Sequence, residues 1–156
     1  MSGSAAGLAT AADHAAVLAL QHRAFAGNRL LLGAEPLPLL ADYDEIFADS
    51  GAWEIWLAVA AEGLAGVLIL MPRQDDLYIW SIATDPAFRG RGVGRDLLAH
   101  ALARAKALEL PALRLCTGRV LSENVAWYAR AGFVIEREEV RPDRVLVHMA
   151  RTLAAP

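Results

Sequence analysis

The hydrophobic pattern of the chain changes its period near residue 93, and this change limits the folds that the chain can adopt. Three extended runs, rich in β-branched and aromatic residues, come first: EIWLAVA (54–60), GLAGVLILM (63–71) and LYIWSIAT (77–84). They predict three strands, of which the first two form a hairpin. From Val93 to Leu108 the apolar residues recur at helical spacing, which predicts one long amphipathic helix. This order predicts a sheet with a helix packed against it.

Shorter patterns on both sides of this segment complete the expected fold. A T-x-x-D cap at Thr10 predicts a first helix, and LLADYDEIFAD (39–49) predicts a second one after an irregular stretch at 27–38. The C-terminal patterns predict a strand at 113–117, a short helix at 122–131 and two strands at 133–140 and 144–152. We therefore expect the α/β (α+β) class, with a mixed, mostly antiparallel central sheet of about six to seven strands flanked by about four helices.

Length, charge and cysteine content exclude several classes of protein. A chain of 156 residues fits one domain, and we expect a flexible segment at 1–9 followed by a single domain at 10–156. The lone Cys116 cannot build a disulfide framework, and a net charge of −3 lacks the basic excess of a nucleic-acid-binding protein. No basic segment precedes the first apolar residues, and no apolar run could span a bilayer. We expect a cytoplasmic location and no membrane partner.

The start of the long helix is rich in glycine and arginine. Residues 88–98 read FRGRGVGRDLL, so glycines and arginines gather where the backbone N–H groups of a helix are unpaired and its dipole is positive. This combination predicts an anion-binding loop, although a glycine-rich turn with solvated arginines is the simpler alternative. The Gly-Lys-Ser/Thr of a P-loop is absent, and the glycines alternate as G-x-G-x-G, unlike a dinucleotide-binding fingerprint.

Two motifs together resemble one known family. The stretch from Arg89 to Gly94 has the pattern R-x-x-G-x-G, which resembles the pyrophosphate loop of the GNAT superfamily of N-acetyltransferases. About thirty residues later, NVAWYARAGF (124–133) is similar to the family's pattern of an asparagine, a tyrosine four residues on, and Gly-Phe before a strand. The two motifs occur in the family's order, with the expected elements between them.

The resemblance implies acetyl-coenzyme A (acetyl-CoA) as cosubstrate, no metal, and a sheet with a splayed strand at the cofactor site. Backbone N–H groups and side chains of the loop would hold the pyrophosphate: Arg89, Gly90, Arg91, Gly92, Val93 and Gly94. Pantetheine would pair with the strand through Ile82, Ala83 and Thr84, and the N–H of Ile82 would polarise the thioester carbonyl. Asn124 would contact the coenzyme, and Tyr128 would protonate the departing thiolate. The implied reaction is direct transfer, in a ternary complex, to a primary amine of a small molecule or a protein.

The identity of the general base and of the acceptor stays open at this point. Where some relatives carry a glutamate or histidine base, this chain has Tyr78 and Trp80, so either Asp75 or Asp76 accepts the proton through water or the amine arrives deprotonated. Six acidic residues could attract a cationic amine or could form a solvated face: Asp42, Asp44, Glu45, Asp49, Asp75 and Asp76. Three tryptophans could line an aromatic pocket or serve the core: Trp53, Trp56 and Trp80.

Two other functions are alternatives to acetyl transfer. A non-catalytic acyl-CoA-binding regulatory domain would keep the glycine loop and dispense with Tyr128. A hydrolase that uses Cys116 is disfavoured, because this residue lies on an apolar strand with no histidine in an evident pairing position. A homodimer is possible.

Overall fold

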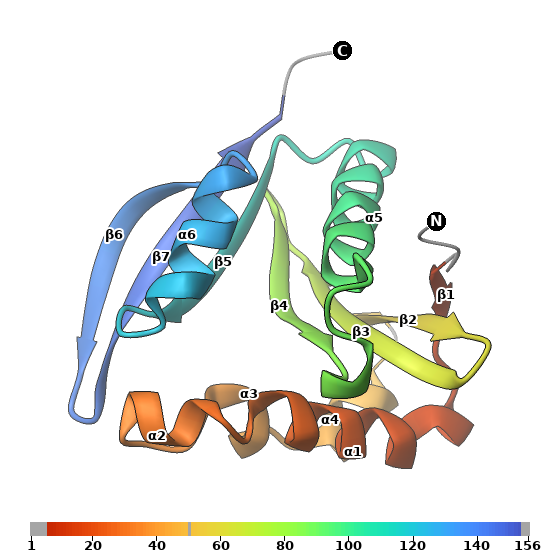
Figure 1. Ribbon diagram of the computed structural model, residues 1–156. Coiled ribbons are helices and arrows are strands. Elements are labelled where there is room, and N and C mark those ends of the chain that lie inside the picture. Colours follow the sequence, from red (N-terminus) through yellow and green to blue (C-terminus); the bar gives the residue numbers. More distant parts are fainter. Residues whose placement is uncertain (1–5, 50, 154–156) are drawn as a thin grey trace.

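The computed structural model describes residues 6–49 and 51–153. Within them one sheet has the strand order β1-β2-β3-β4-β5-β7-β6 (Figure 1). Its strands are β1 (Ala6–Leu8), β2 (Glu54–Ala60), β3 (Gly63–Pro72), β4 (Leu77–Thr84), β5 (Ala112–Gly118), β6 (Val134–Arg141) and β7 (Arg144–Thr152). Neighbouring strands are antiparallel except β4 and β5, which run parallel. The mixed, mostly antiparallel sheet is thereby confirmed.

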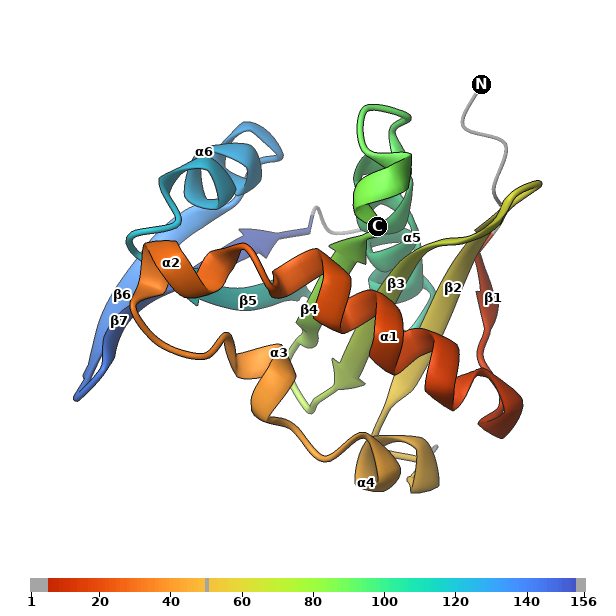
Figure 2. The ribbon, with the colours of Figure 1, turned by 60° about the horizontal axis from the view of Figure 1, so that its bottom comes forward.

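Helices cover both faces of this sheet. They are α1 (His14–Phe25), α2 (Asn28–Leu32), α3 (Leu37–Leu40), α4 (Tyr43–Ala48), α5 (Val93–Ala107) and α6 (Ser122–Arg130). Helices α5 and α6 lie on one face, and α1 to α4 follow one another across the other face (Figures 1 and 2). The two faces are thus built by separate parts of the chain.

The described residues contain six α-helices, where the sequence predicts about four. The stretch at 27–38 is not wholly irregular, because it holds α2. The second predicted helix is divided, because Ala41 is extended with ψ 153° and ends α3. Asp42 then starts α4, since its side chain accepts from the backbone N–H groups of Asp44 and Glu45.

Part of the segment expected to be flexible forms strand β1. Gly7 of β1 pairs with Leu57 of β2, and the N–H of Ala9 donates to the carbonyl of Ile55 at 2.8 Å. Three residues are too few for an alternating pattern to be recognised in the sequence. Residues 1–5, the rest of that segment, lie outside the described residues.

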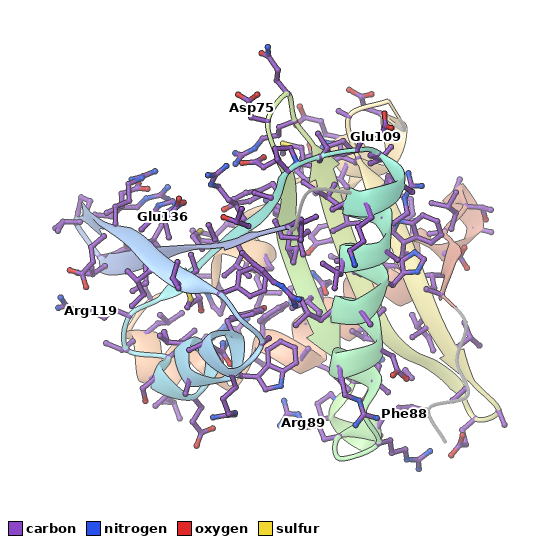
Figure 3. All side chains as sticks on the ribbon, turned by 90° about the horizontal axis from the view of Figure 1, so that it is seen from above. Asp75, Phe88, Arg89, Glu109, Arg119 and Glu136 are labelled. Carbon is purple, nitrogen blue, oxygen red and sulfur yellow. The ribbon has the colours of Figure 1, made fainter. Side chains whose placement is uncertain are left out.

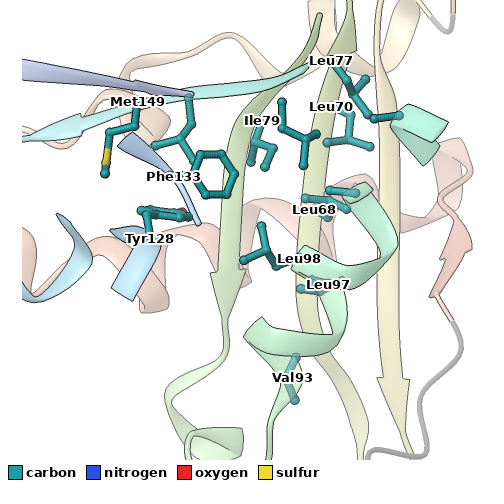
Figure 4. Close-up of a cluster of buried hydrophobic side chains, with 14 of the residues drawn as sticks. Leu68, Leu70, Leu77, Ile79, Val93, Leu97, Leu98, Tyr128, Phe133 and Met149 are labelled. Carbon is teal, nitrogen blue, oxygen red and sulfur yellow. The ribbon is translucent and has the colours of Figure 1, made fainter. Parts of the chain in front are cut away.

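Two hydrophobic clusters hold the helices to the sheet. On the α5 side, Leu97 and Leu98 pack against the inner residues of β3 and β4, and Phe133 and Met149 extend the cluster beneath α6 (Figure 4). On the other side, α1 and α4 pack against β2, β3 and β4 through a set that includes Val17, Leu20, Tyr43, Ile46, Ile55, Val67 and Ile69. Strands β3 and β4 are therefore buried on both faces, as their apolar sequences require.

Helix α5 approaches β3 closely at Gly66. A Cβ built on Gly66 would lie 2.6 Å from Cγ1 of Val93 and 3.0 Å from the carbonyl oxygen of Ala83. The absence of a side chain on this strand residue lets the first turn of α5 rest directly on the sheet. The position of that turn, and of the loop before it, depends on this contact.

We predict that Gly66→Ala lowers the free energy of unfolding by about 1–3 kcal/mol, the usual cost of overpacking a close contact. Gly27→Ala is the matched control, because a Cβ there meets nothing within 4 Å. Urea denaturation of both variants measures the difference. Equal stability of the two variants would show that α5 moves away from Gly66 at little cost.

Candidate functional site

The central feature of the site is the separation of β4 from β5. The two strands pair only where Leu77 meets Leu113 and Tyr78 meets Arg114, whereas β4 continues to Thr84 and β5 to Gly118. A cleft of about 680 Å³ opens beyond these pairs, lined by β4 from Ile79 onward and by the second half of β5. The splayed strand implied by the family resemblance is present, and it leaves one edge of β4 available to a ligand.

A β-bulge lies in β4 beside this cleft. Leu70 of β3 pairs with Ile79 and Ile69 pairs with Ser81, so Trp80 is an extra residue in β4. A bulge turns the following residues relative to the neighbouring strand. Here it brings Trp80 and Ser81 to the same face, where Trp80 packs in the α1-side cluster.

A buried glutamine holds the bulge in place. Nε2 of Gln21 donates to Oγ of Ser81 and to the hydroxyl of Tyr43, both at 2.9 Å, and that hydroxyl donates to the carbonyl of Pro38 at 2.7 Å. These hydrogen bonds connect α1, α3, α4 and β4, and both Ser81 and Pro38 line the cleft. Gln21 was not predicted from the sequence, where the one available signal is a polar residue on the apolar face of a helix.

The N-terminus of α5 opens into the same cleft. Its N-cap residue is Gly92, with φ 79°, and no side chain caps this end of the helix. Gly90 also has a positive φ of 81°, and Arg89 and Arg95 line the cleft beside it. Unpaired N–H groups, the helix dipole and two arginines make this a site for an anionic group.

Tyr128 reaches the cleft from α6. Its ring packs edge-on against Trp127 and Phe133, with centroid distances of 5.0 and 5.6 Å, and only 8% of the residue is exposed (Figure 4). Burial raises the pKa of the Tyr128 hydroxyl well above its ordinary value. The hydroxyl therefore keeps its proton at neutral pH and can donate it.

The cleft brings most of the sequence-predicted site residues together. Its lining includes Ile82, Ala83, Thr84, Arg89, Gly90, Gly92, Val93, Gly94, Asn124 and Tyr128. Arg91 is not part of the lining. Its Nη1 lies 2.6 Å from Oε2 of Glu62, and 52% of its side chain is exposed. The side chain of Arg91 thus points away from the cleft toward the β2–β3 turn.

The expected base residues Asp75 and Asp76 are not at the site. They precede β4, and Figure 3 shows Asp75 at the opposite end of the molecule from Arg89. The carboxylate of Asp76 accepts from Arg73 at 2.6 Å and from Arg114 at 3.0 Å, and these hydrogen bonds lower its pKa. Asp76 is a buried ion-pair partner, and neither aspartate lines the cleft.

The acidic residues of the α4 region serve local structure. Asp42 caps α4, Asp44 pairs with His14 at 2.9 Å, and Asp49 accepts from the N–H groups of the following turn. None of them, and not Glu45, lines the cleft. These residues therefore do not contact a molecule bound in the cleft.

The three tryptophans do not form one pocket. Trp53 packs edge-on against Trp80 at 5.5 Å, whereas Trp56 lies under α5 with its ring 4.2 Å from that of His100. Of the three, Trp80 alone lines the cleft. Trp53 and Trp56 are partly buried and pack against the two hydrophobic clusters.

Cys116 lies in the wall of the cleft. Its Sγ accepts a hydrogen bond from the hydroxyl of Tyr78 at 3.2 Å, and the β5–β7 register puts His148 opposite it. That histidine, 32 positions away in the chain, could not be recognised as a neighbour from the sequence. Nε2 of His148 is hydrogen-bonded to Oε1 of Glu139 at 2.8 Å.

Tyr78 is not a base near neutral pH, because burial raises its pKa.

The described ranges, 6–49 and 51–153, contain no candidate metal cluster and no candidate membrane-spanning helix. No group of three or more His, Cys, Asp or Glu side chains there is placed to hold a metal ion. No helix in that part of the chain has the length and apolar character needed to cross a membrane.

The splayed sheet with an anion site at α5 defines a class of proteins, the acyl-CoA-binding acyltransferases. The acetyltransferase (GNAT) family matches residues 16–133, and the chain belongs to this family of acetyl-CoA-dependent enzymes. An uncharacterized N-acetyltransferase, YvbK of Bacillus subtilis (strain 168), is 30% identical over 108 residues. These residues are 69% of this chain and 66% of YvbK, so the match spans slightly less than two thirds of that relative.

Solved structures share the whole fold. The ribosomal-protein-S18-alanine N-acetyltransferase from Escherichia coli superposes with a TM-score of 0.81 at 17% identity, over 98% of this chain and 96% of that one. The PaiA N-acetyltransferase from Thermoplasma acidophilum, in complex with coenzyme A, has a TM-score of 0.77 at 14% identity, over 97% and 99% of the two chains. At these identities the similarity establishes the fold.

We predict that Gly94→Ala weakens acetyl-CoA binding about tenfold while leaving the fold intact. A Cβ at Gly94 would lie 3.6 Å from Oγ1 of Thr84 and from the ring of Trp127, ordinary contact distances, yet it would add a methyl group at the N-terminus of α5. Calorimetric titration and melting curves measure the two effects, with Gly7→Ala as control. Unchanged affinity in Gly94→Ala would remove this loop from the coenzyme site.

Proposed function

We propose that the protein transfers the acetyl group of acetyl-CoA to a primary amine by direct attack in a ternary complex. The observation that carries this proposal is the continuity of the cleft. One opening in the sheet contains the uncapped N-terminus of α5, the unpaired edge of β4 and the hydroxyl-bearing residue Tyr128. Acetyl-CoA would supply the activated acetyl group, held as a thioester.

The α5 loop would hold the pyrophosphate. The N–H groups from Arg89 to Gly94 are the donors proposed for it, with the side chains of Arg89 and Arg95 adding positive charge. Asn124, one turn before Tyr128 on α6, would contact the coenzyme from the other wall of the cleft. These groups bind the cosubstrate and leave the thioester end directed along β4.

The β4 edge would orient the thioester. Ala83 and Thr84 lie beyond the last residue of β4 that pairs with β5, so this edge can bind pantetheine as a further strand would be bound. The backbone N–H of Ile82 is the proposed donor to the carbonyl oxygen, where negative charge develops. The bulge at Trp80, fixed through Gln21, supports this role because it keeps the donor in position before reaction.

Tyr128 is the proposed general acid. Its raised pKa keeps the hydroxyl protonated at neutral pH, so it can donate a hydrogen bond to the sulfur and pass its proton to the thiolate as the C–S bond breaks. In the alternative function, a non-catalytic acyl-CoA-binding regulatory domain, the same residue would serve packing alone. Substitution of Tyr128 therefore separates the two functions.

We predict that Tyr128→Phe lowers kcat about 100-fold, near the lower end of general-acid effects, and leaves acetyl-CoA affinity nearly unchanged. Tyr78→Phe is the matched control, since Tyr78 is a half-buried tyrosine whose hydroxyl donates to Cys116 and not at the proposed acid position. Steady-state thiol release with an amine substrate measures both variants. An unchanged kcat in Tyr128→Phe would favour the binding domain.

The proton of the attacking amine is the remaining question. Asp75 and Asp76 do not line the cleft, and Tyr78 keeps its proton at neutral pH. We therefore propose that the amine binds in its deprotonated form or loses its proton to water in the cleft. The protein then needs no side-chain base.

We predict that kcat/KM rises with pH along the titration of the acceptor itself, because only the neutral amine has a lone pair. The rise should be centred near about 8 for an α-amino group and near about 10 for an alkylamine. Tyr128 stays protonated throughout most of this range, since its pKa is raised. Profiles that rise at the same pH for both amines would instead identify a base on the protein.

We also propose that turnover needs no metal, that the protein is cytoplasmic, that it has no nucleic-acid or membrane partner, and that it can form a homodimer. Turnover measured with and without a chelator tests the metal independence, and gel filtration tests the oligomeric state.

A further inference from the structure

The cleft has a second cationic end, formed by Arg144. This residue begins β7, and its side chain extends to the loop between α2 and α3, where Nη2 donates to the carbonyl of Glu35 at 2.7 Å. That loop lies on the face of the sheet opposite α5 and α6 (Figures 1 and 2). Arg144 is therefore held to the α2–α3 side of the sheet, and it lines the same cleft as Arg89 and Arg95.

The guanidinium of Arg144 is buried and only partly paired. Its side chain is 4% exposed. Nε and Nη2 donate to the carboxylate of Asp143 at 3.1 and 2.9 Å. Among the described residues no group accepts from Nη1, whose two hydrogens remain for a ligand in the cleft. A buried guanidinium with unsatisfied donors favours an anionic oxygen.

The charges around Arg144 support an anion at this end. The carboxylate of Glu35 is turned away, because it pairs with Arg29. Asp143 is the acidic side chain that contacts Arg144, and its side chain is 55% exposed at the rim. The one acidic residue in the lining of the cleft is Glu123, which belongs to α6 on the other face. A polycationic acceptor would find no carboxylate in the cleft wall beside Arg144.

The cleft that Arg144 lines also contains several apolar side chains. Phe25 and Leu32 come from α1 and α2, Leu37 from α3, Trp80 from the bulge and Leu146 from β7. They offer contact to an aliphatic or aromatic group, and they lower the local dielectric in which Arg144 acts.

From this arrangement we propose that the acceptor is an amine that also carries a carboxylate and an apolar body, such as an apolar amino acid, and that Nη1 of Arg144 binds the carboxylate. The proposal rests on the acetyl-transfer function proposed above and names its substrate class. Arg144 is a specificity-determining residue, and it takes no part in the proton transfers.

The first experiment compares matched acceptors in a thiol-release assay with acetyl-CoA. The probes are leucine, leucinamide and 3-methylbutylamine, the corresponding phenylalanine series, and a peptide whose lysine is its sole free amine. A charge-assisted hydrogen bond in a buried site predicts kcat/KM about 10- to 100-fold higher for the free amino acids than for the amides and amines, at pH values adjusted to equal fractions of neutral amine.

The second experiment changes the arginine. Arg144→Gln should raise the KM for leucine about 10- to 100-fold, leave the KM for leucinamide and for acetyl-CoA within about twofold, and be partly rescued by Arg144→Lys. Arg119→Gln is the control, because Arg119 pairs with Glu138 and does not line the cleft. Melting curves establish that each variant is folded.

A third variant keeps the guanidinium and so does not depend on Arg144→Gln folding. Asp143→Asn removes the counter-charge, and the preference for leucine over leucinamide should rise about threefold, as expected for a partly exposed pair. An unchanged or reduced preference would overturn the carboxylate site.

The remaining outcomes distinguish this inference from the function on which it rests. Equal or better transfer to leucinamide, 3-methylbutylamine or the lysine peptide would overturn the carboxylate site and leave acetyl transfer established. Acetyl-CoA binding with no thiol release for any amine would overturn both proposals.

Discussion

The ending of backbone pairing between β4 and β5 after Tyr78 and Arg114 is the constraint on which the site depends. A sheet that stayed paired to Thr84 and Gly118 would have no cleft, because its side chains and backbone groups would be satisfied internally. The two halves are held apart by their own partners: β4 by β3 and α5, and β5 by its full register with β7. The unpaired edge faces open space, where water or a ligand can satisfy its N–H and C=O groups.

Rigidity around this opening comes from two contacts that are not themselves in it. Gly66 lets α5 rest on β3, which fixes the turn that presents the N–H groups of residues 92–94. Gln21 fixes the bulge at Trp80 through Ser81 and connects it to α4 through Tyr43. In the proposed reaction, donors held in place by these contacts would need little reorganisation.

The arginines that line the cleft lie in two places. Arg89 and Arg95 stand at the helix terminus, and Arg144 is held to the α2–α3 side of the sheet. Outside the cleft, Asp42 caps α4 and Asp76 pairs with Arg73 and Arg114. Tyr128 keeps its proton because burial disfavours the charged form. The arrangement suits an anionic cosubstrate at one end and an anion-bearing acceptor at the other.

The sequence by itself determined the strands from 54 to 84, the long helix from Val93 and the glycine loop, because these depend on local period and backbone conformation. It also located Tyr128 and Asn124 through a local motif. Tertiary structure alone decided that Asp75 and Asp76 do not line the cleft, that His148 faces Cys116, that Gln21 supports the bulge and that Arg144 lines the cleft. These facts depend on strand register and on contacts between residues 32 to 109 positions apart, which no local pattern encodes.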